Sequence, residues 1–311
     1  MARRVVAFTP ILVRYGEIGI KSKRVREQFE RRLVNCIEEQ LILRSVEAET
    51  TRTRGRIYVH AGDVDGALDA LAHTFGVVSA SPTIPTEGTL EAIAALVVER
   101  WRDRYPLGAS FAVRVKRTGQ QPFTSLDVAK ACAERVLTDL ADKQPRVNLT
   151  SPDVELRIEV RDGKAFLFDR TVQGPGGLPI ASQGRTAVWV DSARSAHAAW
   201  LIAKRGSGLV FFAPDVAQAE KWLAPLRAWV PGLQVHEAPS SSRAAAWAAL
   251  GGQFARHKCQ AIVVGDRLDE VAGLRAADTS AGMPVFRPLV GYHGASWQAL
   301  CTQTGIPEGE K

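Results

Sequence analysis

The chain has 311 residues, of which 46% are hydrophobic and 23% are charged. This composition excludes a disordered chain, and the length suits two or three domains, because a domain usually holds about 100–150 residues. No apolar run reaches the ~18 residues of a membrane helix, and the short apolar stretch before Arg14 contains Pro10, so we expect a cytoplasmic protein without membrane contact. The cysteines lie far apart with no CxxC pair and the histidines show no ligand spacing, so we expect no disulfide framework and no metal site.

The positive charge is concentrated at the start of the chain. Residues 1–60 hold 13 Lys and Arg against 7 Asp and Glu, whereas residues 61–179 hold 14 against 16 and residues 180–311 hold 13 against 10. A basic module on a nearly neutral body indicates a polyanionic partner, of which nucleic acid is the commonest. A basic face that only keeps the protein in solution is the alternative.

The first segment predicts a small β-α-β-β layer. Residues 9–15 are typical of a strand, and residues 45–50 and 55–60 are two further strand candidates. Between them, apolar residues recur at four-residue steps from Lys21 to Leu43, which predicts one face of a long helix. These apolar positions are Val25, Phe29, Leu33, Ile37 and Leu41. Basic residues crowd the first turn of this helix, where they oppose its dipole, and a bound polyanion would relieve that cost.

A second module begins near Gly62. It contains a helix over 64–75 that ends at Gly76, an extended segment, and an amphipathic helix over 90–105. The strand over 110–117 alternates apolar and cationic residues, and Ser125 is expected to cap the helix that follows. A hairpin over 154–172 with its turn at 161–163 closes the module.

The segment QGPGGLP (173–179) predicts a linker, because its glycines and prolines break regular structure. After it, short apolar strands alternate with helices to the end of the chain. This pattern is typical of a doubly wound parallel sheet, which binds ligands beyond the carboxyl ends of its strands.

Several runs resemble the tRNA 4-thiouridine synthases, also called tRNA sulfurtransferases and linked to thiamine biosynthesis. They are RYGEIGIKSKRVREQFERRL (14–33), FAVRVKRTGQQPFTS (111–125) and VQGPGGLPIASQGR (172–185). The resemblance implies an α/β protein with a ferredoxin-like domain over 1–61, a THUMP domain over 62–172, a linker over 173–182 and a PP-loop domain of the doubly wound kind over 183–311. In that family the first two domains hold tRNA and the third adenylates a uridine before sulfur transfer. The family also implies a homodimer.

The resemblance and the charge distribution together predict tRNA as the partner. An RNA-binding surface needs cations spaced to meet phosphates. Taken singly, each cation is better explained as a solvated surface charge, whereas the set as a whole favours RNA contact. The candidate RNA-binding residues are Arg14, Lys21, Lys23, Arg24, Arg114, Lys116 and Arg117.

The expected nucleotide loop departs from the family pattern SGGxDS. Alignment on the flanking strand and helix places six residues in the loop: Val190, Asp191, Ser192, Ala193, Arg194 and Ser195. Asp191 puts a carboxylate where phosphate oxygens would lie, which costs roughly 1–4 kcal/mol by Coulomb repulsion. Loss of both glycines removes close backbone approach to the phosphates. We favour a loop in which Asp191 or Ser192 only caps the helix; the alternative is that Arg194 takes over phosphate binding.

The cysteine that accepts sulfur in the family is replaced by Ser241, which cannot form a persulfide. We therefore expect no catalytic residue and no cofactor, and favour a tRNA-binding protein whose adenylation site is lost. One alternative is an active sulfurtransferase that uses ATP, Mg²⁺ and a persulfide donor. The other is an anion-binding protein that uses the loop together with Gly265, which follows a strand end.

Overall fold

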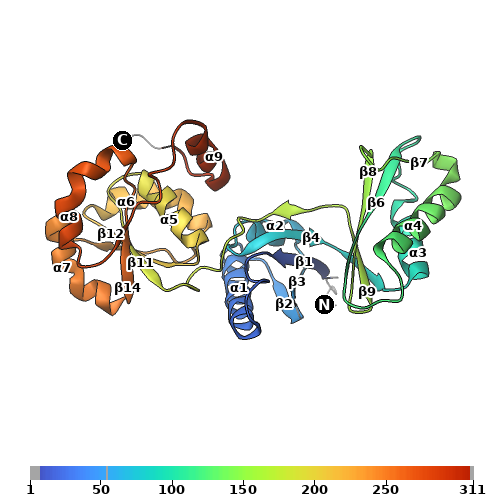
Figure 1. Ribbon diagram of the computed structural model, residues 1–311, viewed down its shortest axis with the longest axis horizontal. Coiled ribbons are helices and arrows are strands. Elements are labelled where there is room, and N and C mark those ends of the chain that lie inside the picture. The colour runs from blue at the N-terminus through green and yellow to red at the C-terminus, as the bar shows by residue number, and fades with distance from the viewer. Residues whose placement is uncertain (1–7, 54, 309–311) are drawn as a thin grey trace, which may run out of the picture. The chain divides into compact units, whose positions relative to one another are not determined.

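The computed structural model describes residues 8–53 and 55–308, so parts of the expected first domain, residues 1–7 and 54, lie outside it. The chain forms two compact units, and Figure 1 shows its helices and strands. One contains residues 1–13, 48–68 and 80–172; the other contains residues 14–47, 69–79 and 173–311. Within the described ranges, no helix has both the length and the apolar character that crossing a membrane requires.

The first sheet has the strand order β10-β4-β1-β3-β2, with β1 antiparallel to β3 and β3 antiparallel to β2. Its elements in chain order are β1 (Thr9–Tyr15), α1 (Lys23–Leu43), β2 (Ala48–Thr53), β3 (Arg56–Ala61), α2 (Val64–Ala72), β4 (Val77–Pro82) and β10 (Val172–Gln173). The succession β-α-β-β-α-β is ferredoxin-like, as predicted. The ferredoxin-like fold extends beyond residue 61, its expected end. Its second helix, α2, and its fourth strand, β4, both follow that residue.

Helix α1 begins two residues later than predicted, at Lys23 after the N-cap Ser22. Four of its five predicted apolar positions are buried, from Phe29 to Leu41. Val25 is the exception at 37% exposure, since it lies in the first turn, before the buried part of the helix begins.

The second sheet has the order β5-β9-β8-β6-β7. Its elements are β5 (Ile84–Glu87), α3 (Leu90–Trp101), β6 (Ser110–Thr118), α4 (Ser125–Asp139), the 3-10 turn η1 (Ala141–Lys143), β7 (Arg146–Val147), β8 (Val154–Arg161) and β9 (Lys164–Phe168). Helices α3 and α4 cover one face (Figure 1), where Val113 and Val115 of β6 pack against the apolar core. The alternation predicted for β6 is therefore confirmed. The predicted cap is wrong: Thr124, not Ser125, caps α4, through a reciprocal capping box with Asp127.

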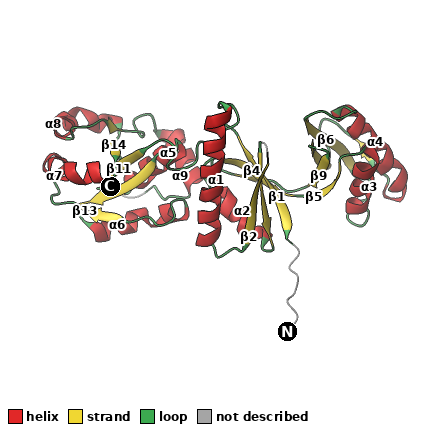
Figure 2. Ribbon diagram, turned by 90° about the horizontal axis from the view of Figure 1, so that it is seen from below, coloured by secondary structure: helices red, strands yellow, loops and turns green. Residues whose placement is uncertain are grey.

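The third sheet is entirely parallel, with the order β13-β12-β11-β14-β15. Figure 2 labels three of its strands, β13, β11 and β14. Its strands are β11 (Arg185–Trp189), β12 (Gly208–Ala213), β13 (Val235–Glu237), β14 (Cys259–Val263) and β15 (Val285–Phe286). Its helices are α5 (Arg194–Lys204), α6 (Val216–Leu223), η2 (Ala224–Ala228), α7 (Arg243–Arg256), η3 (Leu268–Leu274), α8 (Arg275–Ser280) and α9 (Gly294–Thr304). Val188 packs in one core with Trp200 of α5, and Trp189 packs in another with Trp247 of α7. A core on each face confirms the doubly wound sheet.

The segment predicted as a linker is hydrogen-bonded on both of its sides. Gly176 accepts from the Gly76 amide at 2.8 Å and donates to the Val77 carbonyl at 2.7 Å, while the Leu178 amide donates to the Lys204 carbonyl at 3.0 Å. Gly177 has φ +73°, and a Cβ there would lie 2.1 Å from the Lys204 carbonyl oxygen. Glycine is needed at this position for both reasons.

Candidate nucleotide site and nucleic-acid interface

The loop aligned with the nucleotide motif joins β11 to α5 at the carboxyl end of the parallel sheet. The Val190 amide extends the strand by donating to the Phe212 carbonyl at 2.9 Å. Gly265, two residues after β14, lies against the start of α5, because a Cβ there would approach the Ser195 nitrogen to 2.8 Å. The structure thus brings the loop and Gly265 together. The predicted side-chain cap is wrong, because Ala193 occupies the N-cap and no side chain caps the helix.

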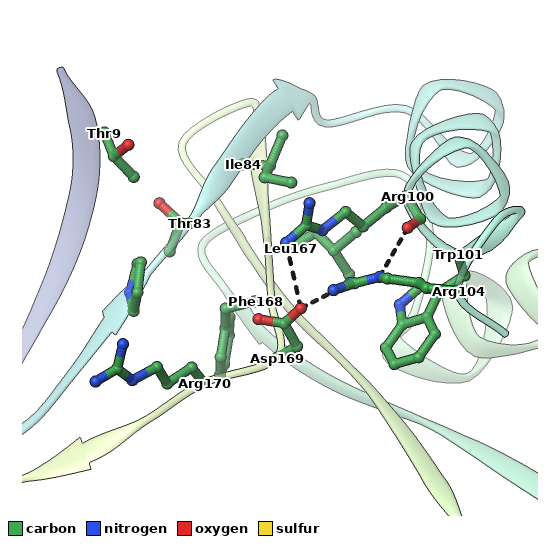
Figure 3. Close-up of a pocket in the computed structure, with 11 residues that line it drawn as sticks. Thr9, Thr83, Ile84, Arg100, Trp101, Arg104, Leu167, Phe168, Asp169 and Arg170 are labelled. Carbon is green, nitrogen blue, oxygen red and sulfur yellow. Dashed lines mark hydrogen bonds and ion pairs between the residues drawn. The ribbon is translucent and has the colours of Figure 1, made fainter. Parts of the chain in front are cut away.

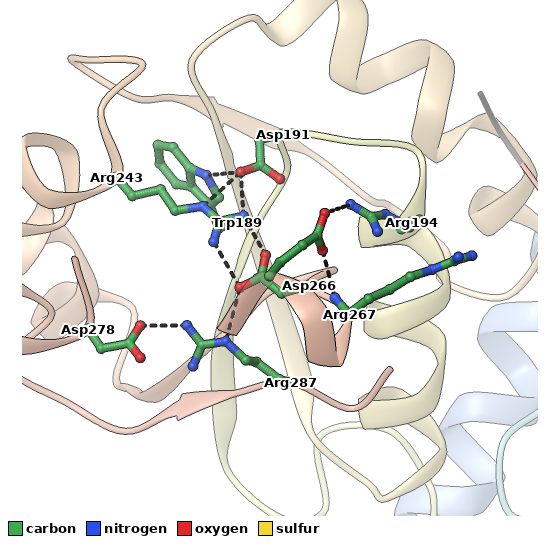
Figure 4. Close-up of polar contacts among 9 residues, drawn as sticks. Trp189, Asp191, Arg194, Arg243, Asp266, Arg267, Asp278 and Arg287 are labelled. Atoms are coloured by element: carbon green, nitrogen blue, oxygen red, sulfur yellow. Dashed lines mark hydrogen bonds and ion pairs between the residues drawn. The ribbon is translucent and has the colours of Figure 1, made fainter. Parts of the chain in front are cut away.

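Asp191 is held by an ion network instead of capping the helix (Figure 4). Its Oδ2 accepts hydrogen bonds from Trp189 Nε1 at 2.9 Å and from Arg243 Nε at 2.8 Å. The same guanidinium, at the start of α7, donates two further bonds to the buried Asp266, at 2.9 and 2.7 Å. Burial alone lowers the pKa of Arg243, but its bonds to Asp266 and Asp191 outweigh burial and raise that pKa above its usual value. Arg243 therefore stays charged and is shared between the two carboxylates.

The network extends to the neighbouring strand end and to η3. Arg287 Nε donates to Asp266 Oδ2 at 3.0 Å, and its terminal nitrogen donates to Asp278 at 2.6 Å. Arg194 donates to Glu270 at 2.8 Å, and this bond holds the pKa of the Glu270 carboxyl below its usual range. Sequence reasoning missed Arg287, Asp278 and Glu270. The position of Arg287 directly after β15 was the available signal, since parallel strand ends share one edge.

The charged side chains at this edge are largely paired with one another. Arg194, Arg243 and Arg287 are bound to four carboxylates, which are Asp191, Asp266, Glu270 and Asp278. The loop aligned with the motif contains no glycine, and the one serine that it keeps, Ser195, is completely buried. Among the residues that the structure describes, no group of three or more His, Cys, Asp and Glu side chains is arranged to hold a metal ion.

Two partly buried cysteines occur in this half of the chain. Cys259 begins β14 and Cys301 lies in α9. Burial raises the pKa of each thiol, which keeps both protonated at neutral pH and makes them poor nucleophiles.

The predicted RNA-binding cations fall on different units. Lys21, Lys23 and Arg24 are exposed around the start of α1, whose first turn contains no acidic residue, and Arg14 is half-buried on β1. Arg114 and Lys116 are exposed on β6, in the other unit. Arg114 donates to Glu155 at 3.3 Å and to the Leu149 carbonyl at 2.7 Å, while the half-buried Arg117 donates to Gln121 at 2.9 Å.

Sequence reasoning missed a cationic pocket of about 360 Å³ beside α3 (Figure 3). Three arginines line it, Arg100, Arg104 and Arg170, together with a single carboxylate, Asp169. The spacing of Arg100, in the last turn of α3, and Arg104, in the turn that follows, was the signal that could have indicated it.

Comparison with known proteins agrees with this architecture. The ThiI ferredoxin-like domain family matches residues 10–81, and the THUMP domain family matches residues 87–169. A probable tRNA sulfurtransferase of Methanosarcina acetivorans is 33% identical over 322 aligned residues, covering 91% of this chain and 77% of that protein. The fold thus defines a THUMP-containing protein with a parallel α/β domain. More specifically, the chain belongs to the tRNA sulfurtransferase family, and the resemblance seen in its sequence is confirmed.

Solved structures agree at the level of the fold. The crystal structure of PH1313 from Pyrococcus horikoshii is 26% identical, with a TM-score of 0.82 over 96% of this chain and the whole of that one. A 4-thiouridine synthetase–RNA complex with bound ATP superposes with a TM-score of 0.75 over 96% of this chain and 84% of that one. Its identity is 20%, so this likeness concerns the fold alone.

Proposed function

We propose that this protein is a cytoplasmic tRNA-binding member of the sulfurtransferase family whose nucleotide site no longer accepts ATP. The observation that carries the proposal is the Asp191–Arg243–Asp266 network, which fills the carboxyl edge of the sheet with internally paired charge. Asp191 and Asp266 occupy the guanidinium donors of Arg243 that a phosphate of the ligand would need.

Binding a triphosphate here would require the network to open. If Arg243 turned towards a phosphate, Asp191 would lose its cation, and Asp266, which is only 3% exposed, would keep Arg287 alone. Breaking a buried ion pair from one side costs several kcal/mol. If Arg243 stayed in place, the phosphates would meet the Asp191 carboxylate. Both routes are unfavourable, which supports loss of the adenylation step.

The tRNA-binding part of the proposal rests on the other domains. Exposed cations surround the start of α1 and line β6, and the THUMP family match covers the domain that contains β6. Phosphate contacts of this kind supply affinity without reading sequence. The homodimer implied by the resemblance stays a prediction.

An active tRNA sulfurtransferase is the second candidate. It is favoured by the relative that matches over 91% of this chain, since that protein's name gives this activity. On this alternative, Arg194 and Arg243 would exchange their carboxylate partners for phosphates. An anion-binding role for the same edge meets the same difficulty, because each of its three arginines already has an acidic partner.

Isothermal titration with ATP and Mg²⁺ separates these functions. We expect no saturable binding heat, whereas a sulfurtransferase that keeps the SGGxDS loop, titrated in parallel, binds. Saturable ATP binding by this protein would refute the proposal. A gel-shift titration with tRNA at low salt tests the other half, and absence of any shift would remove the tRNA-binding function.

A further inference from the structure

Arginines and apolar side chains together line the pocket beside α3 (Figure 3). Arg100 and Arg104 lie close to each other, and Arg170 lies on the other side of Phe168. The apolar part of the lining consists of Trp101, Phe168, Leu167, Ile84 and Pro82. A volume of about 360 Å³ lies within the range of small-ligand sites, which runs from roughly 300 to 1,000 Å³.

Arg104 is held in place before any ligand arrives. Its guanidinium lies 4.2 Å from the centre of the Trp101 ring, a cation–π distance. Its Nε donates to the Arg100 carbonyl at 2.9 Å and a terminal nitrogen donates to Asp169 at 2.6 Å. A guanidinium has five N–H donors, and the Arg104 side chain remains 37% exposed, so donors are left for a second partner.

The pocket has fewer negative than positive charges. Arg100 and Arg104 share the single carboxylate of Asp169, at 3.5 and 2.6 Å. Burial raises the pKa of Asp169, but the hydrogen bond from Arg104 and the charges of both arginines outweigh burial and lower that pKa, so the carboxylate is ionised at neutral pH. Arg170 pairs with Asp65, which lies outside the pocket. The lining therefore keeps an excess of positive charge that one anionic group would balance.

We infer that this pocket binds a backbone phosphate of the RNA, between Arg100 and Arg104, as a contact point additional to the cations predicted from sequence. The inference rests on the proposed tRNA binding. A planar guanidinium fork matches phosphate oxygens in geometry as well as in charge.

The test is tRNA binding by fluorescence anisotropy over a salt series, with Arg100→Gln/Arg104→Gln and Asp169→Asn. The double variant is expected to bind about tenfold more weakly at 0.1 M salt. Its slope of log K against log salt should be smaller by roughly 0.7–0.9, the value of one phosphate contact. Asp169→Asn removes the competing carboxylate and is expected to bind about two- to fivefold more tightly.

The matched control is Arg102→Gln/Lys130→Gln, which removes two exposed cations of the same domain that do not line the pocket. It should leave affinity and slope near those of wild type, and circular dichroism checks that each variant is folded. If both double variants behave alike, or if Asp169→Asn weakens binding, the pocket is not a phosphate site. If wild type itself binds no tRNA, the proposed function fails, and the inference that rests on it fails with it.

Discussion

At the scale of single residues, Arg243 joins the two carboxylates of the ion network at the candidate nucleotide site. Its guanidinium binds Asp191 and Asp266, and its side chain is only 15% exposed. Replacing Arg243 with Met keeps the apolar stem but leaves two facing carboxylates with one cation fewer. Breaking a buried pair from one side costs about 3–5 kcal/mol, and we expect the lower end because Arg287 still pairs with Asp266. Urea unfolding measures the loss.

The control for this prediction is Arg135→Met. Arg135 also binds two carboxylates, Glu91 and Asp139, but it lies on the surface of α4, where solvent screens ion pairs. We expect only a small change in its urea midpoint. Asp266→Asn combined with Arg243→Met should recover part of the lost stability, since one unpaired charge is removed. Equal midpoints for Arg243→Met and Arg135→Met would show that the network contributes nothing.

At the scale of elements, the segment 173–179 is a packed connection and Gly177 is its most constrained residue. Its φ of +73° disfavours any side chain, and a Cβ would collide with the Lys204 carbonyl at the end of α5. Gly177→Ala is therefore expected to lower stability by about 1–3 kcal/mol, through strain and displacement of the segment. Thermal unfolding monitored by circular dichroism measures this change.

Gly251→Ala provides the opposite case. Gly251 lies inside α7 with open space where the Cβ would be added. Alanine suits a helix interior better than glycine by about 1 kcal/mol, so this variant should be neutral or slightly stabilising. If Gly177→Ala unfolds at the same temperature as Gly251→Ala, the segment is a loose linker after all.

The elements themselves could largely be predicted from the sequence, because they depend on local periodicity. The four-residue steps of α1 and the alternation of β6 each reflect which side of one element faces a core. The ion network could not be predicted in this way. Its members lie at positions 191, 243, 266 and 287, and only the parallel order of the strands brings their ends to one edge. The predicted cap by Asp191 failed for this reason, since a distant arginine offers it a stronger partner than the backbone.

At the scale of the whole molecule, the question is whether RNA binding follows from the net charge or from cations at particular positions. The formal net charge is +7, and such an excess attracts any polyanion at low salt. Lys21, Lys23 and Arg24 add a local effect: they crowd the start of α1, where the helix dipole already disfavours positive charge. A phosphate bound there removes that repulsion. These three residues should therefore contribute more to RNA affinity than three exposed cations elsewhere on the protein.

We therefore expect Lys21→Gln/Lys23→Gln/Arg24→Gln to bind tRNA at least tenfold more weakly at 0.1 M salt. Its salt slope should be smaller by roughly 2, as for two or three lost phosphate contacts. The control removes three exposed cations of the parallel-sheet domain and reaches the same net charge: Lys221→Gln/Arg256→Gln/Lys258→Gln. Fluorescence anisotropy should then show a much smaller loss of tRNA affinity. Only the long-range electrostatic field changes in this control, and salt screens that field. Equal losses in the two triple variants would mean that the overall charge, and not the start of α1, determines RNA binding.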